Sequence, residues 1–83
     1  MSNEAASELS PMPGLTFRKG KREANVHEVK GGVVYYGMYL DGEEFPTGLY
    51  RASLAEWDRL ASQALVHGAE VFTKVRPKKG AAQ

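Results

Sequence analysis

The sequence predicts an α+β fold: a single small ββαβ domain in which one helix packs on one face of a mainly antiparallel sheet of three or four strands. Two observations support this prediction, a capped amphipathic helix between residues 53 and 68 and runs of alternating side chains on both sides of it. The length of 83 residues allows no more than one domain.

The helix is the clearest element. Ser53 and Glu56 have the spacing of a capping box, in which each side chain satisfies a backbone N–H at the helix start. Gly68 offers the left-handed residue that ends a helix. Between them, apolar side chains recur every three or four residues and form one stripe: Leu54, Trp57, Ala61, Ala64 and Leu65. We expect this stripe, anchored by Trp57, to lie in the core.

Three strands follow from runs with a period of two residues. Residues 33–40 form the strongest strand, since its apolar and aromatic side chains cover both faces. A hairpin turn at residues 41–42 leads into a strand at residues 45–51, and Pro46 predicts that this strand lies at a sheet edge. The run at residues 71–76 predicts the last strand.

Residues 23–30 form a possible extra strand at the N-terminal side. Val26 and Val29 fall on opposite faces of a regular strand, so the alternation is weak. The two glycines at residues 31–32 predict a tight turn into the next strand, because glycine accepts the positive φ of such turns.

These strands divide their side chains between two sheet faces. The core face carries Val34, Tyr36, Met38, Leu40, Phe45, Leu49, Val71 and Val75, which pack on the helix stripe. The opposite face carries Tyr35, Tyr39, Tyr50, Phe72, Lys74 and Arg76. Aromatic side chains beside Lys or Arg are typical of interface centres, although tyrosines that simply cover a sheet would give the same pattern.

The ends of the chain differ in composition from its body. We expect residues 1–22 to be a disordered arm with a basic end, because the polar and proline-rich start cannot bury enough apolar surface. The domain then spans residues 23–77, and residues 78–83 form a disordered basic tail. Residues 23–73 carry eight acidic and three basic residues, whereas the last ten residues carry four basic ones: Lys74, Arg76, Lys78 and Lys79.

This charge distribution suits a charged protein partner better than nucleic acid, because phosphate neutralisation would favour a basic body. The chain has no cysteine and only two histidines, so no metal or other cofactor is expected. No nucleophile constellation or phosphate-binding loop appears, which argues against an enzyme. The absence of a long apolar run and of an export signal predicts a cytoplasmic protein.

The C-terminal half resembles a known family, the small early inhibitors of host RNA polymerase made by T-seven-like bacteriophages. The likeness runs without a gap from Tyr50 to Pro77 and, by position and pattern only, back to Val34. The shared residues are Tyr50, Ser53-Leu54, Leu60-Ala61, Val66 and the ending Thr73-Lys74-Val75-Arg76-Pro77.

The resemblance implies a three-stranded antiparallel ββαβ sheet whose last strand pairs beside residues 33–40. An extra strand at residues 23–30 would compete for that edge, so either it is not part of the sheet or the last strand lies elsewhere. The resemblance also implies binding to the jaw of the β′ subunit of bacterial RNA polymerase, with Lys74 and Arg76 as the binding pair.

Acidic residues near the binding strand of that family interfere with the DNA path. Their candidates here are Asp41, Glu43, Glu44 and Glu56, while Tyr39 stands where the family has an acid.

The sequence therefore predicts a phage-encoded, non-enzymatic inhibitor that binds bacterial RNA polymerase and blocks transcription initiation. One alternative is another host-takeover protein, such as an anti-CRISPR inhibitor that binds a Cas complex. A second is a small nucleic-acid-binding protein that uses the cations at residues 18–22 and 74–79, with the tyrosines as stacking platforms.

Overall fold

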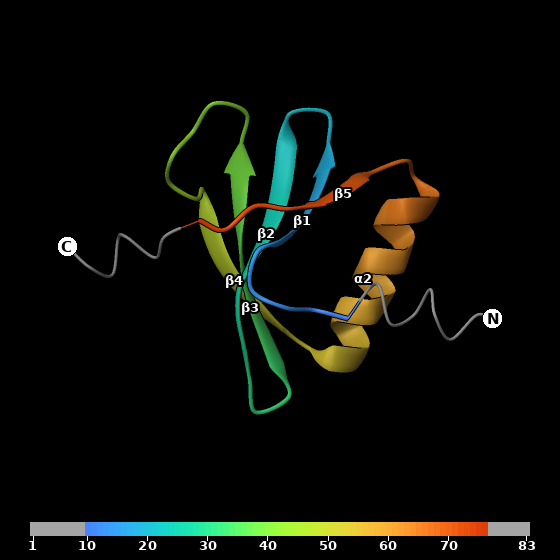
Figure 1. The fold of residues 1–83 in the computed structure, drawn as a ribbon. Helices are drawn as coiled ribbons and strands as arrows, with labels where there is room; N and C mark the ends of the chain where they lie inside the picture. Colours follow the sequence, from blue (N-terminus) through green and yellow to red (C-terminus); the bar gives the residue numbers. More distant parts are fainter. Residues whose placement is uncertain (1–9, 77–83) are drawn as a thin grey trace.

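A computed structural model describes residues 10–76 of the chain as a bent antiparallel sheet with one helix on one face (Figure 1). The elements are β1 (Leu15–Lys19), β2 (Arg22–Lys30), β3 (Val33–Leu40), β4 (Gly48–Ser53), α2 (Leu54–Val66) and β5 (Glu70–Thr73). The strand order is β4-β3-β2-β1-β5, with every neighbouring pair antiparallel. The predicted α+β class is confirmed, and the sheet has five strands where three or four were expected.

The additional strand is β1, which falls within the arm that we predicted to be disordered. That prediction is wrong for residues 15–22, because Leu15, Thr16 and Phe17 are all buried and Phe17 packs against the helix. The N-terminal residues are polar on average, and this average conceals the short apolar run at residues 15–17. Residues 1–9 and the predicted tail at residues 78–83 lie outside the described part of the chain.

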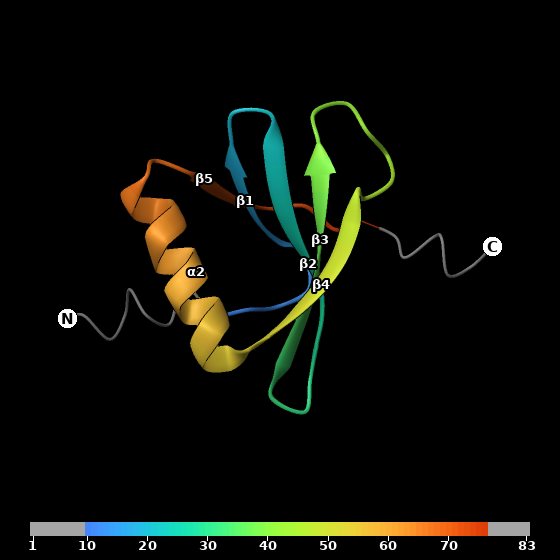
Figure 2. The same ribbon diagram turned by 180° about the vertical axis from the view of Figure 1, so that it is seen from behind.

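The last strand does not pair beside β3, as the resemblance implies. β5 pairs with β1 instead, with Thr16 opposite Phe72 and Phe17 opposite Val71, while β2 occupies the edge of β3 (Figure 2). Of the two alternatives left open, the second is therefore correct: the segment at residues 23–30 is a strand, and the final strand lies elsewhere.

A bulge in β2 explains its weak alternation. Val26 pairs with Tyr36 and Glu28 pairs with Tyr35, so His27 is an extra residue between them. The bulge restores the phase of the strand, and Val26 and Val29 both pack in the core on the helix side. Our expectation that they lie on opposite faces is wrong for this reason.

The register of β4 also differs from the prediction. The turn after β3 does form, with the N–H of Glu43 donating to the carbonyl of Leu40 at 3.0 Å, but the chain continues as a loop to residue 47. Tyr36 then pairs with Tyr50, whereas a two-residue turn would have paired it with residue 47. An odd shift exchanges the faces of a strand. β4 is nevertheless an edge strand, as expected.

The helix begins and ends where its capping signals predict. The hydroxyl of Ser53 accepts from the N–H of Glu56 at 3.0 Å, and the carboxylate of Glu56 accepts from the N–H of Ser53 at 3.1 Å. Gly68 has a φ of 86°, the left-handed conformation that follows a helix. Both caps of the predicted helix are confirmed.

The core lies between the helix and the concave side of the sheet. Trp57 is buried at its centre, with its ring 5.8 Å from that of Phe17 and 5.0 Å from that of Tyr36. The buried set is Leu15, Phe17, Val26, Val34, Ala52, Trp57 and Ala61. The anchoring role predicted for Trp57 fits this position.

Seven residues that we assigned to the core are exposed: Leu40, Phe45, Leu49, Leu54, Leu65, Val71 and Val75. The shifted register moves Leu49 to the other face, and residue 45 belongs to the loop rather than to β4. Leu15, Phe17 and Val26 fill the space instead, because β1 and β2 are interior strands of the sheet.

Candidate functional site

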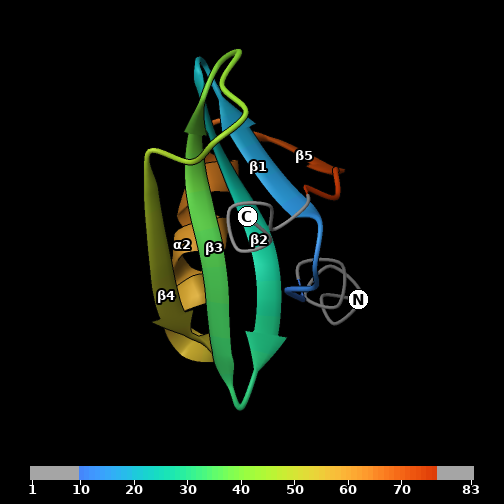
Figure 3. The same cartoon turned by 90° about the vertical axis from the view of Figure 1, so that its left-hand side faces the viewer.

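Residues 74–76 follow β5 and turn back onto the face of the sheet opposite α2; we call them the strap (Figure 3). The N–H of Lys74 donates to the carbonyl of Gly14 at 2.8 Å, and the side-chain amide of Asn25 donates to the carbonyl of Lys74 at 2.7 Å. The backbone N–H and carbonyl of Lys74 are thus both hydrogen-bonded, one to the residue before β1 and the other to β2. These bonds fix the backbone from which the Lys74 side chain extends.

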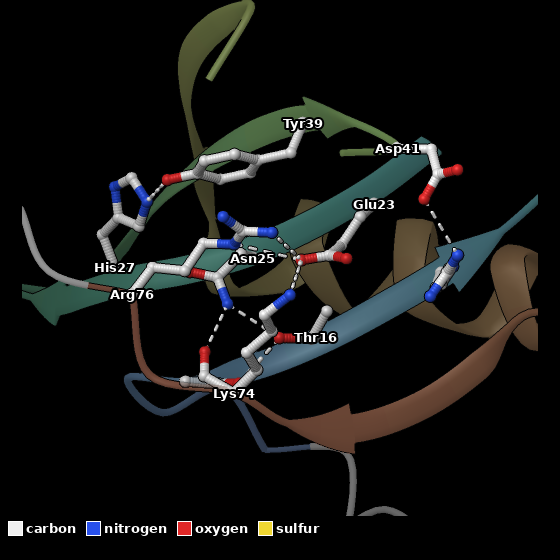
Figure 4. Close-up of polar contacts among 10 residues, drawn as sticks. Thr16, Glu23, Asn25, His27, Tyr39, Asp41, Lys74 and Arg76 are labelled. Carbon is white, nitrogen blue, oxygen red and sulfur yellow. Dashed lines mark hydrogen bonds and ion pairs between the residues drawn. The ribbon is translucent and has the colours of Figure 1, made fainter. Parts of the chain in front are cut away.

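The charged centre of this site is Glu23 on β2. Its oxygen Oε2 accepts from Nη2 of Arg76 at 2.8 Å and from Nε at 3.1 Å, and Nζ of Lys74 lies 3.9 Å away (Figure 4). The side chains of Glu23 and Arg76 are only 9% and 13% exposed, whereas that of Lys74 is 49% exposed. A buried carboxylate therefore holds one strap cation firmly and the other loosely.

Tyr39 forms the floor under Arg76. The guanidinium carbon of Arg76 lies 3.9 Å from the centre of the Tyr39 ring, a cation–π arrangement. The Tyr39 hydroxyl lies 2.7 Å from Nε2 of His27, and these two residues are drawn together in Figure 4. Burial raises the pKa of Tyr39 above its ordinary value of 10.0; Arg76 lowers it in part and Glu23 raises it. The phenol is consequently neutral at physiological pH.

A second polar group under the strap is the buried pair of Asn25 and Thr16. The Asn25 amide donates to Oγ1 of Thr16 at 2.7 Å, and that hydroxyl donates to the carbonyl of Gly14 at 2.9 Å. Both side chains are fully buried. Together these two side chains link β1, β2 and the strap to one another by hydrogen bonds.

Comparisons with models of known protein families, with curated proteins and with solved structures gave no match to this chain.

The predicted cluster of exposed aromatic and basic side chains is only partly formed. Tyr39 is buried and Arg76 is paired with Glu23, while Tyr50 lies on the helix side of the sheet, stacked on Tyr36 at 5.6 Å. Tyr50 changes face because of the shifted register of β4. Tyr35 and Phe72 are half-buried on the strap side. Lys78 and Lys79 lie outside the described residues.

The four predicted acidic residues do not form one patch. Asp41, Glu43 and Glu44 are exposed in the loop after β3, whereas Glu56 caps the helix at the other end of β4 (Figure 1). Asp41 is paired with Arg18 at 3.2 Å, so the basic cluster at residues 18–22 lies against the acidic loop. Opposite charges are mixed at this end of the sheet.

Sequence reasoning found the two strap cations but missed the polar residues beneath them. Glu23 and Asn25 contact the strap directly, while Thr16 and His27 bind Asn25 and Tyr39. One signal was present, because Glu23 and Asn25 alternate with Ala24 and Val26 as a strand with one polar face would. Within residues 10–76 no group of three metal-binding side chains lies together. No helix of this part of the chain is long and apolar enough to cross a membrane.

Proposed function

We propose that this chain is a phage-encoded protein that binds bacterial RNA polymerase in the host cytoplasm and blocks transcription initiation without catalysing a reaction. The observation that carries the proposal is the ungapped likeness from Tyr50 to Pro77, which ends in the strap residues Lys74 and Arg76. These two cations would dock on acidic side chains of the β′ jaw. The exposed acids at residues 41, 43 and 44 would then face the path of the DNA.

The strap geometry supports docking on an acidic surface. The ammonium of Lys74 is half exposed, and its pairing with Glu23 at 3.9 Å is of a kind that contributes about 0–1 kcal/mol. A partner carboxylate can therefore take over Lys74 at little cost. Arg76 is bound more firmly, and its guanidinium becomes available only if the partner replaces Glu23.

The test is capture of polymerase by immobilised protein, from bacterial lysate and with purified core enzyme. We expect Lys74→Glu to weaken capture of the purified enzyme by about tenfold or more, because it places a like charge opposite the acidic surface. Lys30→Glu is the matched control, since Lys30 is an exposed strand cation with the same charge change at the far end of β2.

A third variant, Glu23→Gln, removes the internal carboxylate that competes with the partner. It is expected to bind polymerase at least as well as the unmodified chain while it unfolds more easily. If the unmodified chain captures no polymerase subunit, or if Lys74→Glu and Lys30→Glu bind equally, the proposal is wrong. Recovery of a Cas complex or binding to nucleic acid alone would point to the alternative functions instead.

A further inference from the structure

β4 presents an open strand edge on the side of the sheet away from β5. It is the outermost strand in the sheet order, and within residues 10–76 no strand pairs with its outer edge (Figure 3). Proteins usually protect such edges with Lys, Pro or very short strands, because unpaired N–H and C=O groups invite another chain. β5 fits that rule with four residues, whereas the six residues of β4 include neither Lys nor Pro.

Two large side chains of this edge are exposed to solvent. Leu49 is 70% exposed and Tyr50 is 50% exposed, one on each face of the strand. Each face of the sheet also has a hollow that β4 helps to line. The hollow on the helix side has a volume of about 410 Å³ and is lined by Tyr36, Arg51, Ala52, Glu56, Arg59, Leu60 and Gln63. The hollow on the other face, about 290 Å³, is lined by His27, Tyr35, Tyr36, Leu49, Tyr50 and Arg51.

An added strand would direct its side chains alternately towards the two faces on which these hollows lie. Main-chain hydrogen bonds to the edge would then supply affinity, and the hollows would supply selectivity. Arg51 borders both hollows and is the one charged residue of β4. Its exposed guanidinium favours an acidic side chain on the incoming strand.

The charge of Arg51 also distinguishes between occupants. A second copy of β4 in antiparallel pairing would bring a second Arg51 and no carboxylate. Residues 77–83 carry two lysines and no acid, so they suit the edge no better. The occupant that fits is an extended segment of another protein, with an acidic side chain on one face and apolar side chains on the other.

We propose that β4 is a docking edge that binds an extended acidic segment of a partner protein by strand addition. Apolar side chains of that segment enter the hollow beside Tyr36 and Leu60, and its carboxylate pairs with Arg51. The surface includes no strap residue, so the proposal does not depend on polymerase binding through Lys74.

The probe is a fluorescein-labelled peptide, Thr-Val-Glu-Val-Thr-Val, whose binding is measured by anisotropy and mapped by NMR shifts of the β4 amides. We expect replacement of its Glu by Lys to weaken binding about threefold to fivefold, as for an exposed ion pair. Arg51→Glu in the protein is expected to reverse this preference, whereas Lys19→Glu, an exposed cation at the β1–β2 turn, leaves it unchanged. If Arg51→Glu still binds the Glu peptide more tightly than the Lys peptide, the proposal is overturned.

Two N-methylated versions of the peptide test the backbone contacts. Strand addition uses only every second amide of the peptide, so methylation of one alternate set should weaken binding at least about tenfold while the other set has little effect. Equal binding by both versions overturns the proposal, as does a concentration-dependent dimer of the chain that Arg51→Glu abolishes.

Removal of residues 1–9, which contain Glu4 and Glu8, should change the affinity for the peptide by less than about twofold. If removal of residues 1–9 raised the affinity for the peptide tenfold, that segment would itself be the occupant of the β4 edge.

Discussion

Glu23 and Arg76 lie 53 residues apart in the sequence, and both guanidinium hydrogen bonds of Arg76 converge on a single oxygen of Glu23. The pair closes the strap over the sheet. Removal of one partner leaves the other charge buried, which is far more costly than the absence of the whole pair. We expect Arg76→Met to lower the free energy of unfolding by about 3 kcal/mol, measured by urea unfolding with circular dichroism.

The double variant Glu23→Leu/Arg76→Met is the control for this prediction. It replaces both charged side chains by apolar ones of similar size, and such replacement is often nearly neutral. The double variant should therefore be more stable than Arg76→Met alone. A double variant whose loss equals the sum of the two single losses would mean that the residues are not coupled.

The helix and β3 could be predicted because their signals are local. A capping box, a helical stripe and a run of alternating side chains each depend on residues within a few positions of one another, and Ser53 and Trp57 behave as their positions in the sequence indicate. The face of β4 could not be predicted in this way. Its register depends on the length of the loop after β3, and one odd step exchanged Leu49 and Tyr50.

Of the candidate site, the sequence predicted the two cations but not the carboxylate that pairs with them. Lys74 and Arg76 were found because they alternate in the strand predicted at residues 71–76, although β5 itself ends at Thr73. Their partner Glu23 belongs to a strand whose period is broken by the bulge at His27. Contacts between the two ends of a chain leave no local signal. The pairing of β5 with β1 was missed for the same reason.

Gly37 is required by the close approach of two rings. A Cβ at this position would lie 3.0 Å from Cε1 of His27 and 3.1 Å from Cε1 of Tyr39. Both rings are held by their mutual hydrogen bond, so neither can move away easily. We expect Gly37→Ala to lower the free energy of unfolding by about 1–3 kcal/mol, as overpacking does.

Gly48→Ala is the matched control for Gly37, because it makes the same change in the neighbouring strand. The three atoms nearest to its added Cβ all belong to the phenol of Tyr50, which is half exposed and can swing outwards. This variant should lose less than about 1 kcal/mol. Equal losses for the two glycine variants would show that the rings of His27 and Tyr39 impose no special constraint.

The capping box predicts a further stability effect. Ser53→Ala removes the hydroxyl that accepts from the N–H of Glu56, and the expected loss is about 1 kcal/mol in urea unfolding. Ser53→Asp supplies another acceptor and should recover most of that loss. Ser62→Ala, on the exposed side of the helix, should not destabilise the protein. A loss at Ser62 as large as that at Ser53 would contradict the capping role.

Stability should fall at alkaline pH because of the partly buried Tyr36 and the buried Tyr39. Burial raises the pKa of Tyr36 and of Tyr39 above their ordinary value of 10.0, so the folded chain retains both protons where the unfolded chain loses them. The unfolded state then binds fewer protons than the native state, and the free energy of unfolding decreases as pH rises. This stabilisation is complete below about pH 10 and is lost as the pH passes the folded pKa values.

Urea unfolding at a series of pH values above 9, with phenolate absorbance recorded in parallel, measures this effect. Tyr39→Phe keeps the ring under Arg76 but loses the hydrogen bond to His27, so it should cost about 1 kcal/mol at neutral pH. Because it removes one of the two retained protons, its stability should then fall less steeply with pH than that of the unmodified chain. The same alkaline slope in both proteins would mean that Tyr39 ionises as readily in the folded chain as in the unfolded one.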